Sequence, residues 1–347
     1  MLIIAFAIIE GLAATALFGY DLVASIKRST LRSGIYQEPD DLLGWRTIPN
    51  LEMPDLFGTG LAFRSNGQGF RNTQNFSATR PDNTVRAICS GDSFTLGIGV
   101  SNENTWCSMF SATRQDMESA NLAQAGYGVG QAYLRYSRDA EGLEHDLHIF
   151  AVITDDFRRM RLAKFVGTNK PYFAIKDDEL SLENVPVPAT SRMAVWWTLN
   201  QGIFTETSTG QFINRLMARF PKSPRANPPP RMQTSRELAW KIFEQLHEKT
   251  TARNAKLVLV YLPEQANPMR VGEDWRVLMH TFAAEHDITF VDVYSHLHRL
   301  PVEQRDALFS REWGHFSVAG NRLVSDLIWA TLGKDWQPAD LQHPSTK

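Results

Sequence analysis

A serine, a histidine and a carboxylate stand in this chain where they could activate one another. The segment "RAICSGDSFTLGIGV" places Ser93 between an apolar run and a loop that contains Gly97 and Gly99. A serine hydroxyl is a weak nucleophile until a base takes its proton, and a third group commonly fixes the tautomer of the base. "REWGHFSVAGN" offers both partners, because Glu312 stands three residues before His315. These residues predict acyl transfer, with Ser93 as nucleophile, His315 as base and Glu312 as the group that orients it.

Each of these residues also has an ordinary structural interpretation. A serine in a Gly-Asp-Ser turn is most often only a turn residue, and His315 alone could be a surface or capping histidine. The histidine pairs His145/His148 and His296/His298 could suggest a metal site. No well-spaced set of Cys, Asp or Glu accompanies either pair, so we expect them to be structural. The sequence therefore implies neither a metal nor a cofactor.

An alternation of strands and helices must position the reactive side chains. Short apolar runs followed by Gly-rich or polar loops predict strands, and the amphipathic segments between them predict helices. The expected strands are 84–90, 119–126, 146–157, 255–263 and 288–297, and the expected helices are 102–115, with Asn104 as N-cap, 131–141 and 317–332. Alternation of this kind predicts an α/β fold in which a parallel sheet is covered by helices on both faces.

The candidate residues follow the carboxyl ends of the expected strands. Ser93 comes after the first strand, Gly126 after the second, and Asp155 and Asp156 at the end of the third. His315 lies in the loop before the last helix. Ligands of open α/β sheets bind at this edge, and glycines there let backbone N–H groups approach an oxyanion closely. The sequence therefore predicts one site to which four distant loops contribute.

Two segments depart from this alternation. Residues 26–82 are rich in turn formers and predict a leader of short strands and loops ahead of a main domain at 83–347. Within that domain, residues 159–235 read as an insertion that includes a hairpin and caps the ligand edge. Its aromatic residues could line a substrate cleft, although packing within the cap is the more ordinary role: Trp196, Trp197 and Phe204.

Composition excludes one class of partner. The formal net charge is −2 and the pI is near 6.5, so no basic surplus indicates nucleic-acid binding. The two cysteines, Cys89 and Cys107, allow one disulfide without requiring it, and Cys89 reads as a small core residue.

The N-terminal stretch "MLIIAFAIIEGLAATALFG" is apolar except for Glu10. Its length and lack of a polar face favour an uncleaved membrane anchor over residues 1–25, and the alternative is a buried helix of the main domain. By the positive-inside rule, Lys27, Arg28 and Arg32 would keep the main domain in the cytoplasm. The sequence thus predicts a single-pass membrane protein and leaves undecided on which side of the membrane the main domain lies.

Four segments together resemble a known superfamily. "SGDSFTLG", "NLAQAGYG", "ITDDF" and "EWGHFSVAGN" look like blocks I, II, III and V of the SGNH (GDSL-type) hydrolases, in that order. "GWRTIPN" and "RSNGQGFRN" look like the leader of its membrane-anchored bacterial members, which suggests an extracytoplasmic side. The resemblance implies a flavodoxin-like three-layer α/β/α sandwich. The first block lacks the second glycine of a G-x-S-x-G elbow, which argues against the α/β-hydrolase fold.

The resemblance also implies roles for individual residues. Ser93 would be the nucleophile and His315 the base, with the backbone N–H groups of Ser93 and Gly126 as oxyanion donors. Asp155 stands where the family has a third donor, an asparagine, and Glu312 where it has an aspartate. The implied function is a serine esterase or O-acyltransferase acting on ester-bearing small molecules or glycans, with acetyl groups as one acyl class. Asp155 keeps open the alternative of an inactive relative that binds a glycan or supports a polysaccharide-modifying complex.

Overall fold

Five parallel strands form the centre of the molecule. The computed structural model describes residues 11–12, 14–19, 35–191, 195, 198, 232–265, 273–333 and 336–338. The strands of the central sheet are β5 (Val85–Gly91), β6 (Met117–Asn121), β7 (Leu147–Val152), β12 (Lys256–Tyr261) and β13 (Thr289–Asp292). Every pairing among them is parallel, and their order across the sheet is β13-β12-β7-β5-β6. The predicted parallel sheet is confirmed.

The strand order contains a reversal beside β5. From β5 the chain moves to β6 on one side, then returns to β7 on the other side and continues outward to β12 and β13. Taken in chain order, this is the 2-1-3-4-5 arrangement of flavodoxin-like folds, whose ligands bind where the order reverses. The loop after β5, which carries Ser93, therefore lies at the switch point of the sheet.

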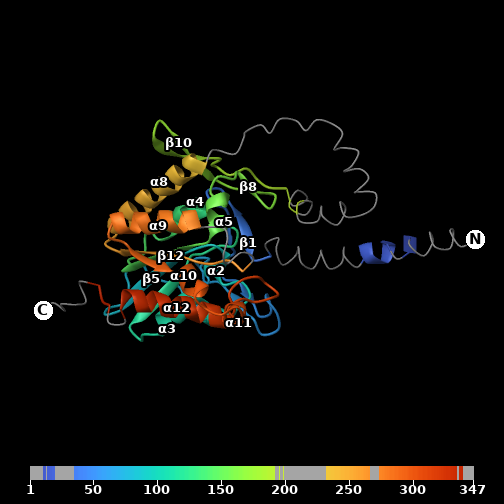
Figure 1. Cartoon of the computed structure of the whole chain (residues 1–347), viewed down its shortest axis with the longest axis horizontal. Coiled ribbons are helices and arrows are strands. Elements are labelled where there is room, and N and C mark those ends of the chain that lie inside the picture. Colours follow the sequence, from blue (N-terminus) through green and yellow to red (C-terminus); the bar gives the residue numbers. More distant parts are fainter. Residues whose placement is uncertain are drawn as a thin grey trace, which may run out of the picture.

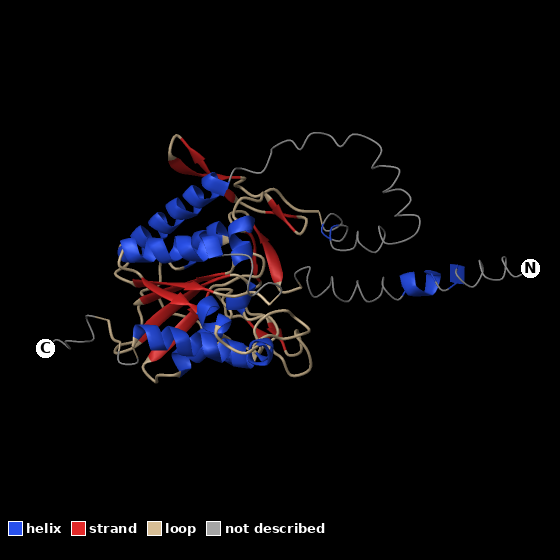
Figure 2. Ribbon diagram, in the orientation of Figure 1, coloured by secondary structure: helices blue, strands red, loops and turns tan. Residues whose placement is uncertain are grey.

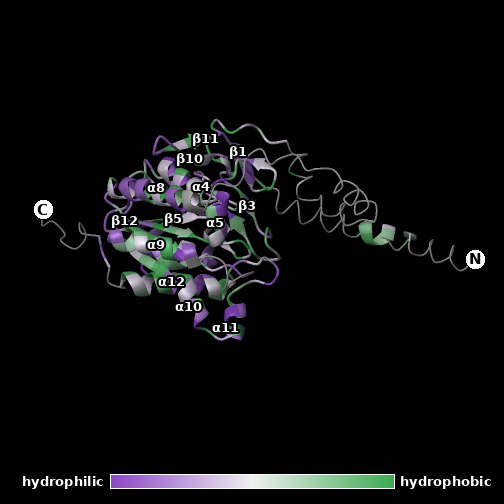
Figure 3. Ribbon diagram, turned by 45° about the horizontal axis from the view of Figure 1, so that its top comes forward, coloured by the Kyte–Doolittle hydropathy of each residue, from purple (hydrophilic) through white to green (hydrophobic). Residues whose placement is uncertain are grey.

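Helices cover both faces of the sheet and give three layers (Figures 1 and 2). On one face lie α4 (Val129–Asp139), α8 (Met232–Thr251) and α9 (Glu273–Glu285). On the other face lie α3 (Trp106–Ala112), α10 (Val293–His298) and α12 (Val318–Leu332). The short helix α11 (Val302–Ala307) has no buried residue and appears in hydrophilic colours at the rim (Figure 3).

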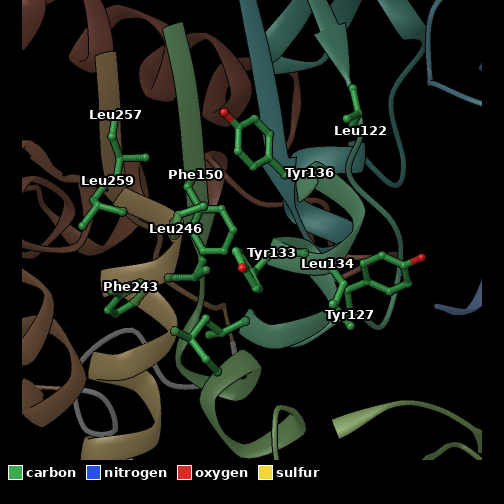
Figure 4. Close-up of a cluster of buried hydrophobic side chains, with 14 of the residues drawn as sticks. Leu122, Tyr127, Tyr133, Leu134, Tyr136, Phe150, Phe243, Leu246, Leu257 and Leu259 are labelled. Atoms are coloured by element: carbon green, nitrogen blue, oxygen red, sulfur yellow. The ribbon is translucent and has the colours of Figure 1, made fainter. Parts of the chain in front are cut away.

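Alternation along the strands builds one core on each face. Phe150 and Leu259 point toward α4 and α8, where they meet aromatic and aliphatic side chains of those helices (Figure 4). Ile149 and Val258, their neighbours in sequence, belong to the core under α3 and α12. Successive side chains of a strand point to opposite faces, so the same strands contribute to both cores. The helices on each face close these cores to water.

The segments outside the sheet form small antiparallel pairs. Before β5 these are β1 (Gln37–Asp40) with β2 (Gly44–Thr47), and β3 (Glu52–Met53) with β4 (Phe63–Arg64); after β7 they are β8 (Lys164–Phe165) with β9 (Thr168–Asn169), and β10 (Tyr172–Lys176) with β11 (Glu179–Glu183). The last pair is the hairpin expected in the insertion. Trp196, Trp197 and Phe204 lie outside the described residues.

The predicted boundaries differ from the observed ones where polar side chains cap a turn. The helix expected at 102–115 is α3, capped by the Thr105 hydroxyl rather than by Asn104, and a 3₁₀ turn, Asn102–Asn104, precedes it. The strand expected at 146–157 ends at Val152. There α5 (Thr154–Arg159) begins, because the Asp156 carboxylate accepts the Ile153 N–H at 3.0 Å.

The membrane anchor predicted over residues 1–25 requires correction. Residues 11–12 and 14–19 are helical, and the rest of that stretch lies outside the described residues. Among the residues that the structure does describe, no helix has both the length and the apolar character that crossing a bilayer requires. Hydropathy of the sequence alone favoured a span, and this finding overturns the single-pass prediction.

A disulfide joins the central sheet to a helix. Cys89 in β5 is bonded to Cys107 in α3, and both side chains are fully buried. Cys89 is therefore more than the small core residue that its apolar neighbours suggested. The bond fixes α3 against the strand that ends two residues before Ser93.

Candidate active site

Ser93 and His315 form a hydrogen-bonded pair at the carboxyl edge of the sheet. Ser93 begins the short helix α2 (Ser93–Leu96), directly after β5, and His315 lies in the loop between α11 and α12. His315 Nε2 lies 2.8 Å from Ser93 Oγ. The imidazole also packs against the Phe94 ring, at 4.6 Å between centroids. Ser93 is 7% exposed and His315 is half-buried, so the pair is accessible at the edge of the protein.

A backbone carbonyl determines the tautomer of His315. The Nδ1 atom lies 2.7 Å from the carbonyl oxygen of Trp313. A carbonyl can only accept, so Nδ1 carries the proton and Nε2 keeps a lone pair for the Ser93 hydroxyl. Trp313 is itself held in place, because its ring lies edge-on to Phe57 at 5.5 Å and closes over Gly99.

The Trp313 carbonyl takes the place that we expected for the Glu312 carboxylate. The Glu312 side chain is exposed, and Nδ1 of His315 is already occupied by the Trp313 carbonyl. The expectation rested on spacing, which identifies a nearby side chain but says nothing of main-chain acceptors. No sequence signal could have identified a carbonyl, because every residue has one.

Two backbone N–H groups in the loops after β5 and β6 are the expected oxyanion donors. In the part of the chain that the structure describes, neither the Ser93 N–H nor the Gly126 N–H donates to a protein group. Gly126 has φ +80°, and a Cβ there would lie 2.9 Å from the Phe165 ring, so a side chain has neither the conformation nor the room. Both N–H groups are thus available to donate to an oxyanion, as expected from the sequence.

The leader shapes the loop that carries Gly126. Trp45 Nε1 donates to the carbonyl of Ala125 at 2.9 Å, and the hydroxyl of Tyr127 donates to the carbonyl of Trp45 at 2.6 Å. The residues on both sides of Gly126 are thus tied to Trp45. The turn-rich composition of this segment predicted loops but gave no sign of this role.

Asp155 is held as a carboxylate by two arginines. Arg158 Nε donates to Asp155 Oδ1, and Arg159 Nε donates to Asp155 Oδ2 at 2.7 Å. Burial acts to raise the pKa of Asp155, but the hydrogen bond to Arg158 and the charges of Arg159 and Arg158 lower it below its usual range. Asp155 is thus ionised near neutral pH and cannot donate a hydrogen bond through its carboxyl group. The sequence placed Asp155 at this edge but did not reveal its arginine partners.

Further acidic side chains lie at this edge of the sheet. Asp92 is 1% exposed, caps α2 by accepting the Phe94 N–H at 2.9 Å, and has Oδ2 at 3.3 Å from Ser93 Oγ. Burial and the charge of Asp92 raise the pKa of Asp156 well above its usual range. Glu264, in the loop after β12, has its pKa raised to about 7 by burial and by the charges of Asp155 and Asp92. The loops after β5, β7 and β12 thus place acidic groups close enough to raise one another's pKa, and the sequence pattern did not identify Asp92 or Glu264.

A second serine–histidine pair lies inside the core. His148 Nε2 is 2.9 Å from Ser90 Oγ, and Nδ1 is 3.2 Å from Thr250 Oγ1. Burial lowers the pKa of His148 well below its usual value, so the ring is neutral. Ser90 and His148 are 1% and 0% exposed, so substrate cannot reach them. The pair agrees with a structural role for His148.

No family model matches the chain, and no curated protein matches it. Among solved structures, the chain is similar to a lipolytic protein of the G-D-S-L family from Veillonella parvula DSM 2008, with 12% identity, 73% of this chain and 100% of that chain covered, and a TM-score of 0.42. It is also similar to a lipase/acylhydrolase from Enterococcus faecalis, with 12% identity, 74% and 98% covered, and a TM-score of 0.42. A mutant of an acetyl-xylooligosaccharide esterase from Geobacillus Stearmophilus gives 12% identity, 74% and 98% covered, and a TM-score of 0.42.

Proposed function

We propose that the chain is a serine esterase that cleaves ester-linked acyl groups through a seryl ester intermediate. The observation that carries the proposal is the hydrogen bond between Ser93 Oγ and His315 Nε2, in the tautomer that lets the imidazole accept a proton. His315 takes the hydroxyl proton while Ser93 Oγ attacks the ester carbonyl carbon. The Ser93 and Gly126 N–H groups donate to the oxyanion that forms.

The second half of the reaction returns the enzyme to its starting state. The protonated His315 gives its proton to the leaving alkoxide, which departs as an alcohol and leaves an acyl group on Ser93. Water, activated by the same imidazole, then attacks the acyl carbon, and Ser93 Oγ leaves with the proton. An acceptor alcohol in place of water would make the chain an O-acyltransferase, with O-acetylated glycans as one class of substrate.

A second candidate function is binding without catalysis. The observation that favours it is Asp155, whose ionised carboxylate stands where the superfamily has a donor. A negative charge close to a developing oxyanion opposes its formation. Against this, Arg158 and Arg159 engage the carboxylate oxygens of Asp155, so its charge is largely neutralised.

Hydrolysis of 4-nitrophenyl acetate separates the two candidates. We expect turnover by the wild-type chain and a loss of about 1,000-fold or more in kcat in Ser93→Ala, because loss of the nucleophile disables the catalytic unit. Glu303→Gln, on the exposed surface of α11, serves as the matched control and keeps wild-type turnover. Equal turnover in the wild type and Ser93→Ala would contradict the esterase proposal.

A further inference from the structure

One buried arginine touches three of the loops that make up the site. Arg159 closes α5, and its guanidinium Nη1 donates to Asp92 Oδ2 at 3.2 Å, in the loop after β5. The same nitrogen donates to the carbonyl of Tyr127 at 3.1 Å, in the loop after β6. It also lies 3.0 Å from Asp156 Oδ1, so its two N–H groups are shared among three acceptors, and Nε donates to Asp155 Oδ2; both carboxylates are on α5 itself. The guanidinium thus joins the nucleophile loop, the oxyanion loop and the loop after β7.

The guanidinium stays charged in this position. Burial acts to lower the pKa of Arg159, but Asp156, Asp92 and Asp155 together raise it above its usual value. The Phe165 ring covers the guanidinium at 4.9 Å, and the side chain is about 10% exposed. A planar cation with several donors in fixed directions can serve several acceptors at once, which an ammonium group does less well.

The contact with Asp92 bears on the Ser93 hydroxyl. That hydroxyl has one proton and two acceptors near it, His315 Nε2 at 2.8 Å and Asp92 Oδ2 at 3.3 Å. Only the bond to His315 leads to proton transfer to the base. Arg159 donates to the same Asp92 oxygen, which places a competing donor on it and leaves the hydroxyl proton for His315.

The contact with Tyr127 bears on the oxyanion site. The carbonyl of Tyr127 follows Gly126 in the loop, so its position helps to determine where the Gly126 N–H points. The Phe165 ring, which lies under Arg159, is also the group that a side chain at Gly126 would strike. Arg159 and Phe165 therefore lie against neighbouring residues, Tyr127 and Gly126, of the same turn.

We propose that Arg159 is a positioning residue that directs the Ser93 hydroxyl toward His315 and aligns the Gly126 N–H with the oxyanion. The inference rests on the esterase function proposed above. Arg158, the next residue toward the N-terminus, offers a matched control. It has the same side chain on the same helix and also binds Asp155, but it is 57% exposed.

Steady-state kinetics on 4-nitrophenyl acetate tests the proposal with Arg159→Met, Arg159→Lys and Arg158→Met. We expect Arg159→Met to lower kcat by about 100-fold with KM changed less than threefold, because small misplacements of reacting groups act on the transition state. Arg159→Lys keeps the positive charge but not the planar set of donors, so its kcat should lie between those of Arg159→Met and wild type. Arg158→Met removes one partner of Asp155 but none of the contacts to Asp92 and Tyr127, so it should lower kcat clearly less than Arg159→Met does. Equal kcat in Arg159→Met and wild type, or an effect on KM alone, would overturn the proposal.

Two measurements keep the result decisive if the first variant does not fold or if the chain has no esterase activity. Circular dichroism establishes folding, and where Arg159→Met fails, Arg159→Lys carries the kinetic comparison. Where wild type itself shows no turnover, the esterase proposal fails and crystal structures decide the positioning proposal. A Ser93 hydroxyl turned from His315 to Asp92 in Arg159→Lys supports it. An unchanged Ser93 rotamer and an unmoved Tyr127 carbonyl overturn it.

Discussion

Ser93 Oγ and His315 Nε2 lie 2.8 Å apart although 222 positions separate them in the sequence. The loop after β5 brings the serine to the switch point of the sheet, and the loop before α12 brings the histidine to the same edge. The Trp313 carbonyl at Nδ1 gives the imidazole the tautomer that a general base requires.

The orientation of His315 by a carbonyl predicts a small role for Glu312. We expect Glu312→Gln to keep kcat within about threefold of wild type, whereas removing a carboxylate that fixes the tautomer costs roughly 10,000-fold in a serine protease. Kinetics of Glu312→Gln beside His315→Gln measures both effects. A loss of 100-fold or more in Glu312→Gln would show that the carboxylate, rather than the Trp313 carbonyl, orients the base.

The arginine pairs of Asp155 predict that its protonation does not control activity. The pKa of Asp155 lies below its usual range, so the group stays ionised from about pH 5 upward. We expect pH–rate profiles of wild type and Asp155→Asn to have the same shape between pH 5 and 8, with Asp155→Asn at least as active. A fall of wild-type activity with rising pH that Asp155→Asn lacks would mean that a protonated Asp155 donates to the oxyanion.

Glu264 predicts a pH-dependent effect on stability. Its pKa is raised from 4.5 to about 7 by burial and by the charges of Asp155 and Asp92. Between those pH values the folded chain keeps a proton on Glu264 that the unfolded chain has lost. The free energy of unfolding therefore falls as pH rises through this range. Above pH 7 the whole cost of burying the charged carboxylate is present.

Glu264→Gln removes this cost while keeping an acceptor for the backbone N–H of Asp155. After allowance for solvent screening, we expect Glu264→Gln to exceed wild type by ~1 kcal/mol in free energy of unfolding at pH 8, and by much less at pH 4. Urea unfolding at both pH values measures the difference. The same gain at pH 4 and pH 8 would show that ionisation of Glu264 is not its source.

The disulfide predicts a loss of stability when it is removed. Cys89 and Cys107 are 18 positions apart, and closing a loop of that length stabilises a folded chain by ~3 kcal/mol in the loop-entropy treatment. Both side chains are fully buried, so Cys89→Ala/Cys107→Ala should show lower stability without a change of fold. Urea unfolding of this double variant and of the reduced wild type measures the loss. Identical midpoints for all three proteins would contradict the assignment.

Much of the fold follows from the sequence because local pattern and burial agree there. Five apolar runs gave the five parallel strands, and the amphipathic pattern after Ser317 gave α12, whose N-cap is that serine hydroxyl. The boundaries after β7 and β13 were missed, because the apolar pattern continues into α5 and α10 while Asp156 and Asp292 start new helices. A cap depends on one or two side-chain hydrogen bonds, and the periodicity of apolar residues does not reveal them.

The candidate site was predictable only in part, for a related reason. Topology brings Ser93, Gly126 and Asp155 to one edge of the sheet, so chain order alone placed them together. The groups that orient these residues and set their hydrogen bonds could not be predicted in this way. The carbonyl of Trp313, the guanidinium of Arg159 and the indole of Trp45 act through geometry that arises only when distant segments pack.

If Ser93 is an activated nucleophile, a fluorophosphonate probe will label it, because such probes react covalently with activated serines. Ser90 provides an internal control, since it lies 2.9 Å from a histidine nitrogen yet is buried. We expect mass spectrometry to find one label, on Ser93, in the wild type and in Ser90→Ala, and no label in Ser93→Ala. An unlabelled wild-type chain, or labelling that survives in Ser93→Ala, would show that Ser93 is not the nucleophile.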